Sequence, residues 1–206
     1  MTTTAARRRM SRDDRRRQLV EVARRVVVEE GADALTLGRL AVRAGVSKPV
    51  VYDHFGTRTG ALVALYEDYD RRQTGLLVAA LDAAERSLAA QLATVARCHV
   101  ACVLDHGAEI GGVVAALAGA PDLAEVKRRS DERYVETCRR AITETDPSAE
   151  WTAAAAIAFL GAADALSEAA LRGDLARDEA EAALTDLLAS QVVVGTRPDR
   201  GRACPP

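Results

Sequence analysis

Residues 36–55, TLGRLAVRAGVSKPVVYDHF, predict two short helices joined by a tight turn. Apolar residues of the first helix recur at helical spacing: Leu37, Leu40, Ala41 and Ala44. Gly45 ends this helix, because glycine adopts the left-handed conformation without a Cβ penalty. Ser47 is the N-cap of the second helix, and Pro49 falls in its first turn, where a missing N–H costs little. The second helix is too short to be stable alone, so it must pack on a neighbour.

The second helix presents two different faces. Val51 and Phe55 are four residues apart, so they share a face that can pack on a neighbouring helix. The opposite face carries Lys48, Val50, Tyr52, Asp53 and His54. A helix-turn-helix inserts such a second helix into the major groove of DNA. Helix pairs are common in all-α proteins, however, so the pattern alone fits DNA binding and ordinary packing about equally well.

Residues 34–62, ALTLGRLAVRAGVSKPVVYDHFGTRTGAL, closely resemble the DNA-binding signature of TetR-family transcriptional regulators. The matching positions are Thr36, Leu40, Ala41, Ala44, Gly45, Val46, Ser47, Tyr52, His54, Phe55, Arg58 and Leu62. The resemblance covers about the first third of the chain, and the rest is similar to the family only in length and helical character. It implies an all-α fold of about nine helices, with an N-terminal three-helix helix-turn-helix DNA-binding domain and a C-terminal helical ligand-binding and dimerisation body.

Chemistry and resemblance together predict the residues that contact DNA: Thr36, Ser47, Lys48, Pro49, Val50, Tyr52, His54 and Arg58. Thr36 precedes a helix N-terminus, where its hydroxyl and nearby N–H groups can hold a phosphate, and Lys48 suits a phosphate or a guanine edge. The alternative for His54 and Tyr52 is structural, as a helix cap and as half-buried packing. Pro49, Val50 and Arg58 depart from the residues most frequent in the family, which leaves the operator sequence open.

The charge is unevenly distributed along the chain, although its net value is only −2. Residues 1–60 hold 13 Lys or Arg and 7 Asp or Glu, whereas residues 61–206 hold 15 and 23. A basic head on an acidic body is expected of a protein whose one end meets phosphates. Seven arginines precede residue 18: Arg7, Arg8, Arg9, Arg12, Arg15, Arg16 and Arg17. They are expected to act as an arm on the minor groove or the phosphates, the alternative being a solvated charge run.

The composition favours a helical protein of the cytoplasm. Apolar residues make up 49% of the chain and aromatic residues only 3%, and no stretch alternates with the period of a strand. The sequence has no signal peptide and no run of 18 apolar residues, so a cytoplasmic, nucleoid-associated protein without a membrane partner is expected. The cysteines Cys98, Cys102, Cys138 and Cys204 show no disulfide spacing, which indicates reduced thiols.

The helical pattern predicts nine helices, over residues 12–30, 37–44, 48–55, 57–84, 88–105, 113–118, 121–145, 150–171 and 178–194. Three glycines, Gly107, Gly111 and Gly112, are expected to break the pattern between the fifth and the sixth. The expected domains are a disordered basic tail (1–11), a helix-turn-helix domain (12–56), an effector-binding and dimerisation domain (57–196) and a disordered tail (197–206).

The predicted body carries one suggestive cluster. His99, Cys102 and His106 are spaced to share a helix face. They could line a pocket or ligate a metal, and no fourth ligand is evident. The full set of candidate pocket residues is His99, Cys102, His106, Tyr134, Cys138, Trp151 and Phe159, each of which could equally be plain core. We therefore predict neither a metal nor a cofactor.

The last two predicted helices carry apolar stripes that suit a homodimer. The small residues of 153–163 permit close helix approach, and the following helix adds Leu184, Leu187, Leu188, Val192 and Val193. The alternative is that these stripes are buried within one subunit. The resemblance implies a repressor that binds a palindromic operator as a dimer and leaves it when a small-molecule effector binds. A ligand-independent DNA-binding adaptor is the alternative; an enzyme is disfavoured, since neither an HExxH motif nor a glycine-rich phosphate loop occurs.

Overall fold

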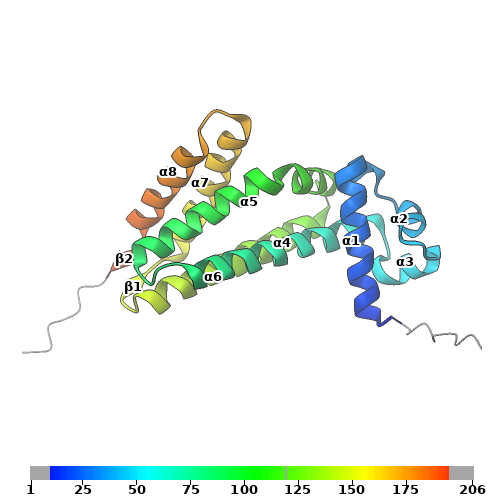
Figure 1. The fold of residues 1–206 in the computed structure, drawn as a ribbon, viewed down its shortest axis with the longest axis horizontal. Helices are drawn as coiled ribbons and strands as arrows, with labels where there is room; N and C mark the ends of the chain where they lie inside the picture. Colours follow the sequence, from blue (N-terminus) through cyan, green and yellow to red (C-terminus); the bar gives the residue numbers. More distant parts are fainter. Residues whose placement is uncertain (1–9, 119, 195–206) are drawn as a thin grey trace, which may run out of the picture. The chain divides into compact units, whose positions relative to one another are not determined.

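The computed structural model describes residues 10–118 and 120–194, and almost all of this part is helical. The helices are α1 (Arg12–Glu30), the 3-10 helix η1 (Ala32–Ala34), α2 (Leu37–Ala44), α3 (Lys48–Phe55), α4 (Arg58–Ala83), α5 (Leu88–Leu117), α6 (Pro121–Thr145), α7 (Ala153–Arg172) and α8 (Arg177–Gln191) (Figure 1). Two-residue strands β1 (Ala149–Glu150) and β2 (Val193–Val194) pair antiparallel. The predicted all-α fold with an N-terminal helix-turn-helix is confirmed.

The chain forms two compact units. The first contains the residues up to Asp70 together with Ala108–Val126, and the second contains Arg71–Gly107 and the residues from Lys127 onward. Helices α4, α5 and α6 each contribute to both units. The predicted functional boundary at residue 57 stays a prediction. The two predicted disordered tails fall almost entirely on residues 1–9 and 195–206, which lie outside the described residues.

The predicted break after residue 105 is wrong. Helix α5 runs without interruption through Gly107, Gly111 and Gly112. A glycine inside a helix costs only about 1 kcal/mol relative to alanine. Beyond these glycines, Val113 and Leu117 are buried in the core of the first unit, so tertiary packing offsets the low propensity.

The predicted ends of the last two helices also shift. Helix α7 begins at Ala153 rather than at residue 150, because the Thr152 side chain caps it by accepting from the Ala155 N–H. Helix α8 ends at Gln191, and the chain then pairs as β2, with Val194 opposite Ala149.

The second unit has its own core, to which α5 and α7 contribute their buried faces. Both helices are long and apolar enough, by length and composition alone, to cross a membrane. The buried residues of these two helices pack in one core, with Val95, Val100, Phe159 and Ala163 all fully buried. Leu184 and Leu188 of α8 are fully buried in the same core, so for them the alternative of burial within one subunit holds.

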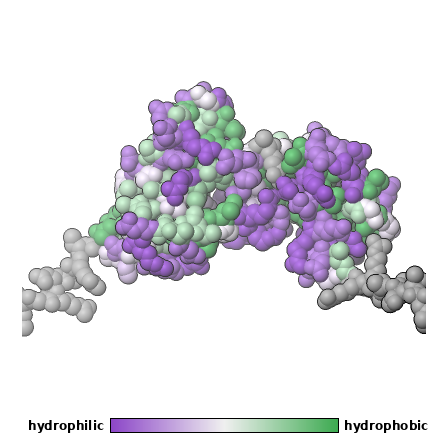
Figure 2. Space-filling view, viewed as in Figure 1, coloured by the Kyte–Doolittle hydropathy of each residue, from purple (hydrophilic) through white to green (hydrophobic). Residues whose placement is uncertain are grey.

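Apolar side chains also reach the surface of the second unit. Figure 2 shows green and pale apolar patches between purple hydrophilic ones on this part of the molecule. Ile157 of α7 is 72% exposed, and small residues of the same helix are exposed beside it: Ala153, Ala154, Ala158 and Gly161. This exposed strip is therefore not used by the chain's own core.

Candidate nucleic-acid interface

The turn between α2 and α3 has the caps that the sequence predicts. Thr36 is the N-cap of α2, and its hydroxyl accepts a hydrogen bond from the Arg39 N–H at 3.0 Å. Gly45 ends α2 in the left-handed conformation, with φ of 65°, and the next N–H, of Val46, donates to the Ala41 carbonyl. Ser47 occupies the N-cap position of α3, although its side chain makes no cap hydrogen bond within the described part of the chain.

The two faces of α3 are separated as expected. Val51 and Phe55 are buried in the core of the first unit. Lys48, Pro49 and Tyr52 are exposed, with 54% of Tyr52 accessible, whereas Val50 and His54 are half-buried. Burial lowers the pKa of His54, which favours the neutral imidazole. The alternative of a half-buried, purely packing Tyr52 does not match its exposure.

The structure brings Thr36 and Lys48 together at the N-terminus of α2. A β-carbon on Gly38 would lie 3.7 Å from Cε of Lys48 and 3.9 Å from Oγ1 of Thr36. A hydroxyl, an ammonium group and the first N–H groups of a helix therefore share one small area. This combination attracts a phosphate, because all three present partial or full positive charge.

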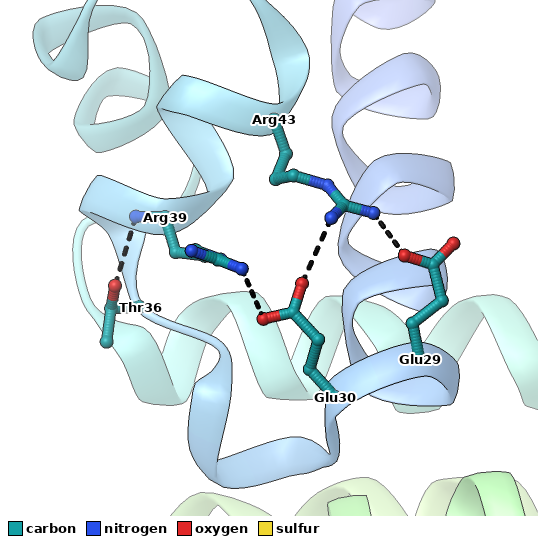
Figure 3. A network of polar contacts seen from close by, with 5 residues as sticks. All are labelled: Glu29, Glu30, Thr36, Arg39 and Arg43. Carbon is teal, nitrogen blue, oxygen red and sulfur yellow. Dashed lines mark hydrogen bonds and ion pairs between the residues drawn. The ribbon is translucent and has the colours of Figure 1, made fainter.

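Helix α2 is held on α1 by an exposed ion-pair network, shown in Figure 3. Glu30, near the end of α1, accepts from Arg39 at 2.6 Å and from Arg43 at 3.1 Å, and Arg43 also pairs with Glu29. Isolated exposed pairs stabilise little, but the side chain of Glu30 is only 24% exposed and joins two arginines. The network fixes how the first helix of the turn docks, and it engages two arginines of the basic head.

Arg58 is engaged inside the protein. Its guanidinium donates to the carbonyl oxygens of Leu35 and Ala32, both at 2.9 Å, and lies 3.4 Å from the Asp33 carboxylate. It thereby ties the segment between α1 and α2 to the start of α4. The predicted DNA contact of Arg58 stays a prediction, and the structure gives this side chain an intramolecular role in addition.

We expect Arg58→Ala to lower the free energy of unfolding by about 1–3 kcal/mol, because two half-buried carbonyls lose a charged donor. Arg58→Lys should recover only part of this, since a single ammonium cannot reproduce a fork that reaches both carbonyls. Denaturant unfolding measures the loss. If Arg58 serves mainly a phosphate, the variant will instead keep its stability and bind DNA with a shallower salt dependence.

The described arginines of the predicted arm belong to α1. Arg15 donates to the Gln18 side chain and Arg17 pairs with Asp14, within the first turns of the helix. Arg12 and Arg16 reach α3. The remaining three, Arg7, Arg8 and Arg9, lie outside the described residues.

The sequence pattern does not single out Gly60, yet the helix-turn-helix depends on it. A β-carbon there would lie 2.1 Å from the carbonyl oxygen of Phe55, the last residue of α3. The Gly60 N–H donates to the Thr57 hydroxyl at 3.0 Å, which caps the first turn of α4. Only a glycine in that first turn lets α4 start so close to the end of α3. The only feature of the sequence that could have identified Gly60 is the presence of a glycine within a predicted helix.

Four of the predicted pocket residues form an aromatic cluster in the second unit, in which Trp151 and Phe159 are buried and His99 and Tyr134 are half-buried. The His99 ring lies edge-on to Tyr134 (5.5 Å between centroids) and to Phe159 (6.3 Å), and Phe159 in turn meets Trp151 at 5.6 Å. His99 Nδ1 is 3.3 Å from the Tyr134 hydroxyl, and Nε2 is 3.7 Å from the Asp164 carboxylate.

The other three pocket residues have more ordinary surroundings. Cys138 is fully buried, and burial raises the pKa of its thiol to about 12. Cys102 and His106 are half-buried on α5. Among the residues whose side chains the structure describes, no three His, Cys, Asp or Glu side chains gather as metal ligands. An open groove of about 440 Å³ lies elsewhere on the unit, lined by Thr74, Arg129, Glu132, Arg133, Glu136 and Thr137.

Residues 19–65 match the family model of bacterial regulatory proteins of the tetR family. The multidrug binding protein EbrR, solved with imidazole, is 19% identical with a TM-score of 0.68 over 95% of this chain and 100% of that one. A structure assigned to TetR-family regulators from Mesorhizobium loti is 18% identical, with a TM-score of 0.67 over 88% and 96%.

A third similar structure, assigned as a transcriptional regulator from Saccharomonospora viridis, was solved with choline. It is 16% identical, with a TM-score of 0.65 over 89% of this chain and 100% of that one. The comparison with curated proteins found no match. At these identities the solved structures show a shared fold. The family model matches residues 19–65, a range that includes both α2 and α3.

Proposed function

Since the chain belongs to the tetR family of bacterial regulatory proteins, we propose that it is a sequence-specific DNA-binding transcriptional repressor. The observation that carries the proposal is the meeting of Thr36 and Lys48 at the N-terminus of α2, beside a helix α3 whose Tyr52 is exposed. Phosphates would bind at this N-terminus, and the exposed face of α3 would enter the major groove. We place this activity in the cytoplasm, on the chromosome.

The proposed dimer reads a palindrome. One copy of α3 covers a single half-site, so two copies related by a two-fold axis are needed for a palindromic operator. The exposed strip around Ile157 on α7 is the surface that we assign to the partner copy. A contiguous apolar strip of this kind is characteristic of interaction surfaces.

The proposed effector is a small molecule that binds in the second unit. Similar folds were solved with imidazole and with choline, and the aromatic cluster here offers buried ring surface. Among the described residues, the Trp151 indole nitrogen and the Ser167 hydroxyl are buried without a hydrogen-bond partner, and buried polar atoms normally have one. An effector would lower DNA affinity if it bound the DNA-incompetent state better than the DNA-binding state.

A thermal-shift measurement with small molecules distinguishes such a ligand-binding regulator from a ligand-independent DNA-binding adaptor. Nothing in the site indicates catalysis.

Selection of bound DNA from a random pool tests the proposal and defines the operator. On that operator we expect Lys48→Ala to weaken binding and to reduce the slope of log affinity against log salt by about one per subunit. Tyr52→Ala should also weaken binding while helicity and dimerisation stay intact. Lys127→Ala is the matched control, because Lys127 is the other lysine of the chain and pairs with Asp164 in the second unit. Unchanged affinity for both Lys48→Ala and Tyr52→Ala would remove α3 from the groove.

A further inference from the structure

At the C-terminal end of α3, two backbone carbonyl groups accept hydrogen bonds from side chains of α1. The last four carbonyls of any helix have no partner inside it. Here the Tyr52 carbonyl accepts from the Gly56 N–H at 2.8 Å, and the Phe55 carbonyl accepts from the Thr57 N–H at 2.7 Å. The two carbonyls between them, of Asp53 and His54, accept hydrogen bonds from the side chains of Arg12 and Arg16, about 40 residues earlier in the chain.

Arg16 of α1 is the stronger of these two donors. Its Nη1 donates to the His54 carbonyl at 2.8 Å, and its guanidinium carbon lies 5.2 Å from the centre of the Phe55 ring. The side chain is half-buried, and Phe55 beneath it is 8% exposed. The guanidinium therefore makes a charge-assisted hydrogen bond and a cation–π contact with two consecutive residues of α3.

Arg12 extends the same arrangement by one helical turn. It is four residues before Arg16, so both side chains lie on one face of α1. Its Nη2 reaches the Asp53 carbonyl at 3.4 Å and the Asp53 carboxylate at 3.7 Å. Both contacts are long and exposed, so they add less than those of Arg16. Two cations at the C-terminal end of α3 also complement the negative end of its dipole.

We propose that Arg16, assisted by Arg12, is a positioning residue for the DNA-reading helix. It holds the C-terminal end of α3 on α1 and so fixes the angle at which Lys48 and Tyr52 are presented. This inference rests on the proposed function, since it concerns the helix that reads DNA. It also reassigns Arg12 and Arg16, because a guanidinium engaged with α3 is not part of an arm that tracks phosphates.

The distinction between a positioning residue and a phosphate contact is measurable. A phosphate contact contributes to specific and non-specific binding alike and adds about one unit to the salt slope per subunit. A positioning residue acts only where base edges must meet side chains in register, so its loss reduces the affinity for the operator but not for random duplex.

The experiment compares Arg16→Ala and Arg16→Lys with Arg25→Ala, an exposed arginine of the same helix. Two quantities are measured on the full chain: amide hydrogen exchange from Asp53 to Gly56, and affinity for the selected operator and for random duplex at several salt concentrations. For Arg16→Ala we expect about tenfold faster exchange at these amides, matching the loss of a charged hydrogen bond. We also expect about tenfold weaker operator binding, with an unchanged salt slope and unchanged binding to random duplex.

Arg16→Lys retains the charge but has no planar group to lie over Phe55, so it should give intermediate values. Melting of each variant separates this local effect from general unfolding. Three results would overturn the inference. The first is an unchanged rate of amide exchange in Arg16→Ala, and the second is an equal loss of affinity for operator and for random duplex in that variant, with a shallower salt slope. The third is full operator affinity in Arg16→Lys although its amide exchange stays fast. If the native protein selects no DNA, the proposed function fails, and the exchange measurement still decides whether Arg16 holds α3.

Discussion

Ile157→Glu is expected to convert a dimer into monomers and to lower operator affinity by at least about a hundredfold. Ile157 is 72% exposed in the single chain, with exposed small residues around it on α7. In an isologous dimer, the two copies would bring two carboxylates into one apolar contact, where an unpaired charge costs several kcal/mol. Because each half-site is bound by one copy, losing the dimer removes the gain from simultaneous binding.

Sedimentation measures the state of the protein, and titration of the operator measures the consequence. Leu76→Glu is the matched control, since Leu76 is a comparably exposed apolar residue, at 58%, on a different helix. Leu188 is not suitable for this test, because it is fully buried in its own subunit and a charge there would unfold the chain. A native protein that sediments as a monomer at micromolar concentration and still binds a palindrome would contradict the dimer.

The features that the sequence predicts best are those set by residues close together in the chain. The bounds of α1, α2 and α3 follow from short-range signals, among them Thr36 at one N-cap and Gly45 at the turn, and the structure reproduces them. The separation of Val51 from Tyr52 follows from helical periodicity alone. These features need no knowledge of what the helices pack against.

What the sequence does not reveal depends on distant partners. Propensity places a break at Gly107, whereas packing of Val113 and Leu117 carries α5 through it. Arginines near the N-terminus suggest an arm, whereas Arg16 finds a carbonyl 38 residues later. Leu184 and Leu188 of α8 lie in the stripe that the sequence offers for a dimer, whereas the structure buries both in the core of their own subunit. In each case the deciding contact joins segments whose proximity exists only after folding.

Gly60→Ala is expected to destabilise the helix-turn-helix by about 1–3 kcal/mol, although alanine is the better helix former. The added β-carbon would lie 2.1 Å from the Phe55 carbonyl oxygen, and that neighbour is backbone, which cannot rotate away. The start of α4 and the end of α3 must therefore separate. We expect the displaced α3 to lose about tenfold or more in operator affinity, because base contacts depend on its placement.

Gly75→Ala on the same helix is the control with the opposite sign. Among the described atoms, a β-carbon at Gly75 would meet nothing within 4 Å, so the substitution should stabilise the helix by up to about 1 kcal/mol. Urea unfolding of the two variants, with operator titration beside it, measures both effects. The comparison isolates the close approach at residue 60, since both changes add one methyl group to α4. Stabilisation by both substitutions would mean that α4 can move away from Phe55 at no cost, and that the junction does not constrain the DNA-reading helix.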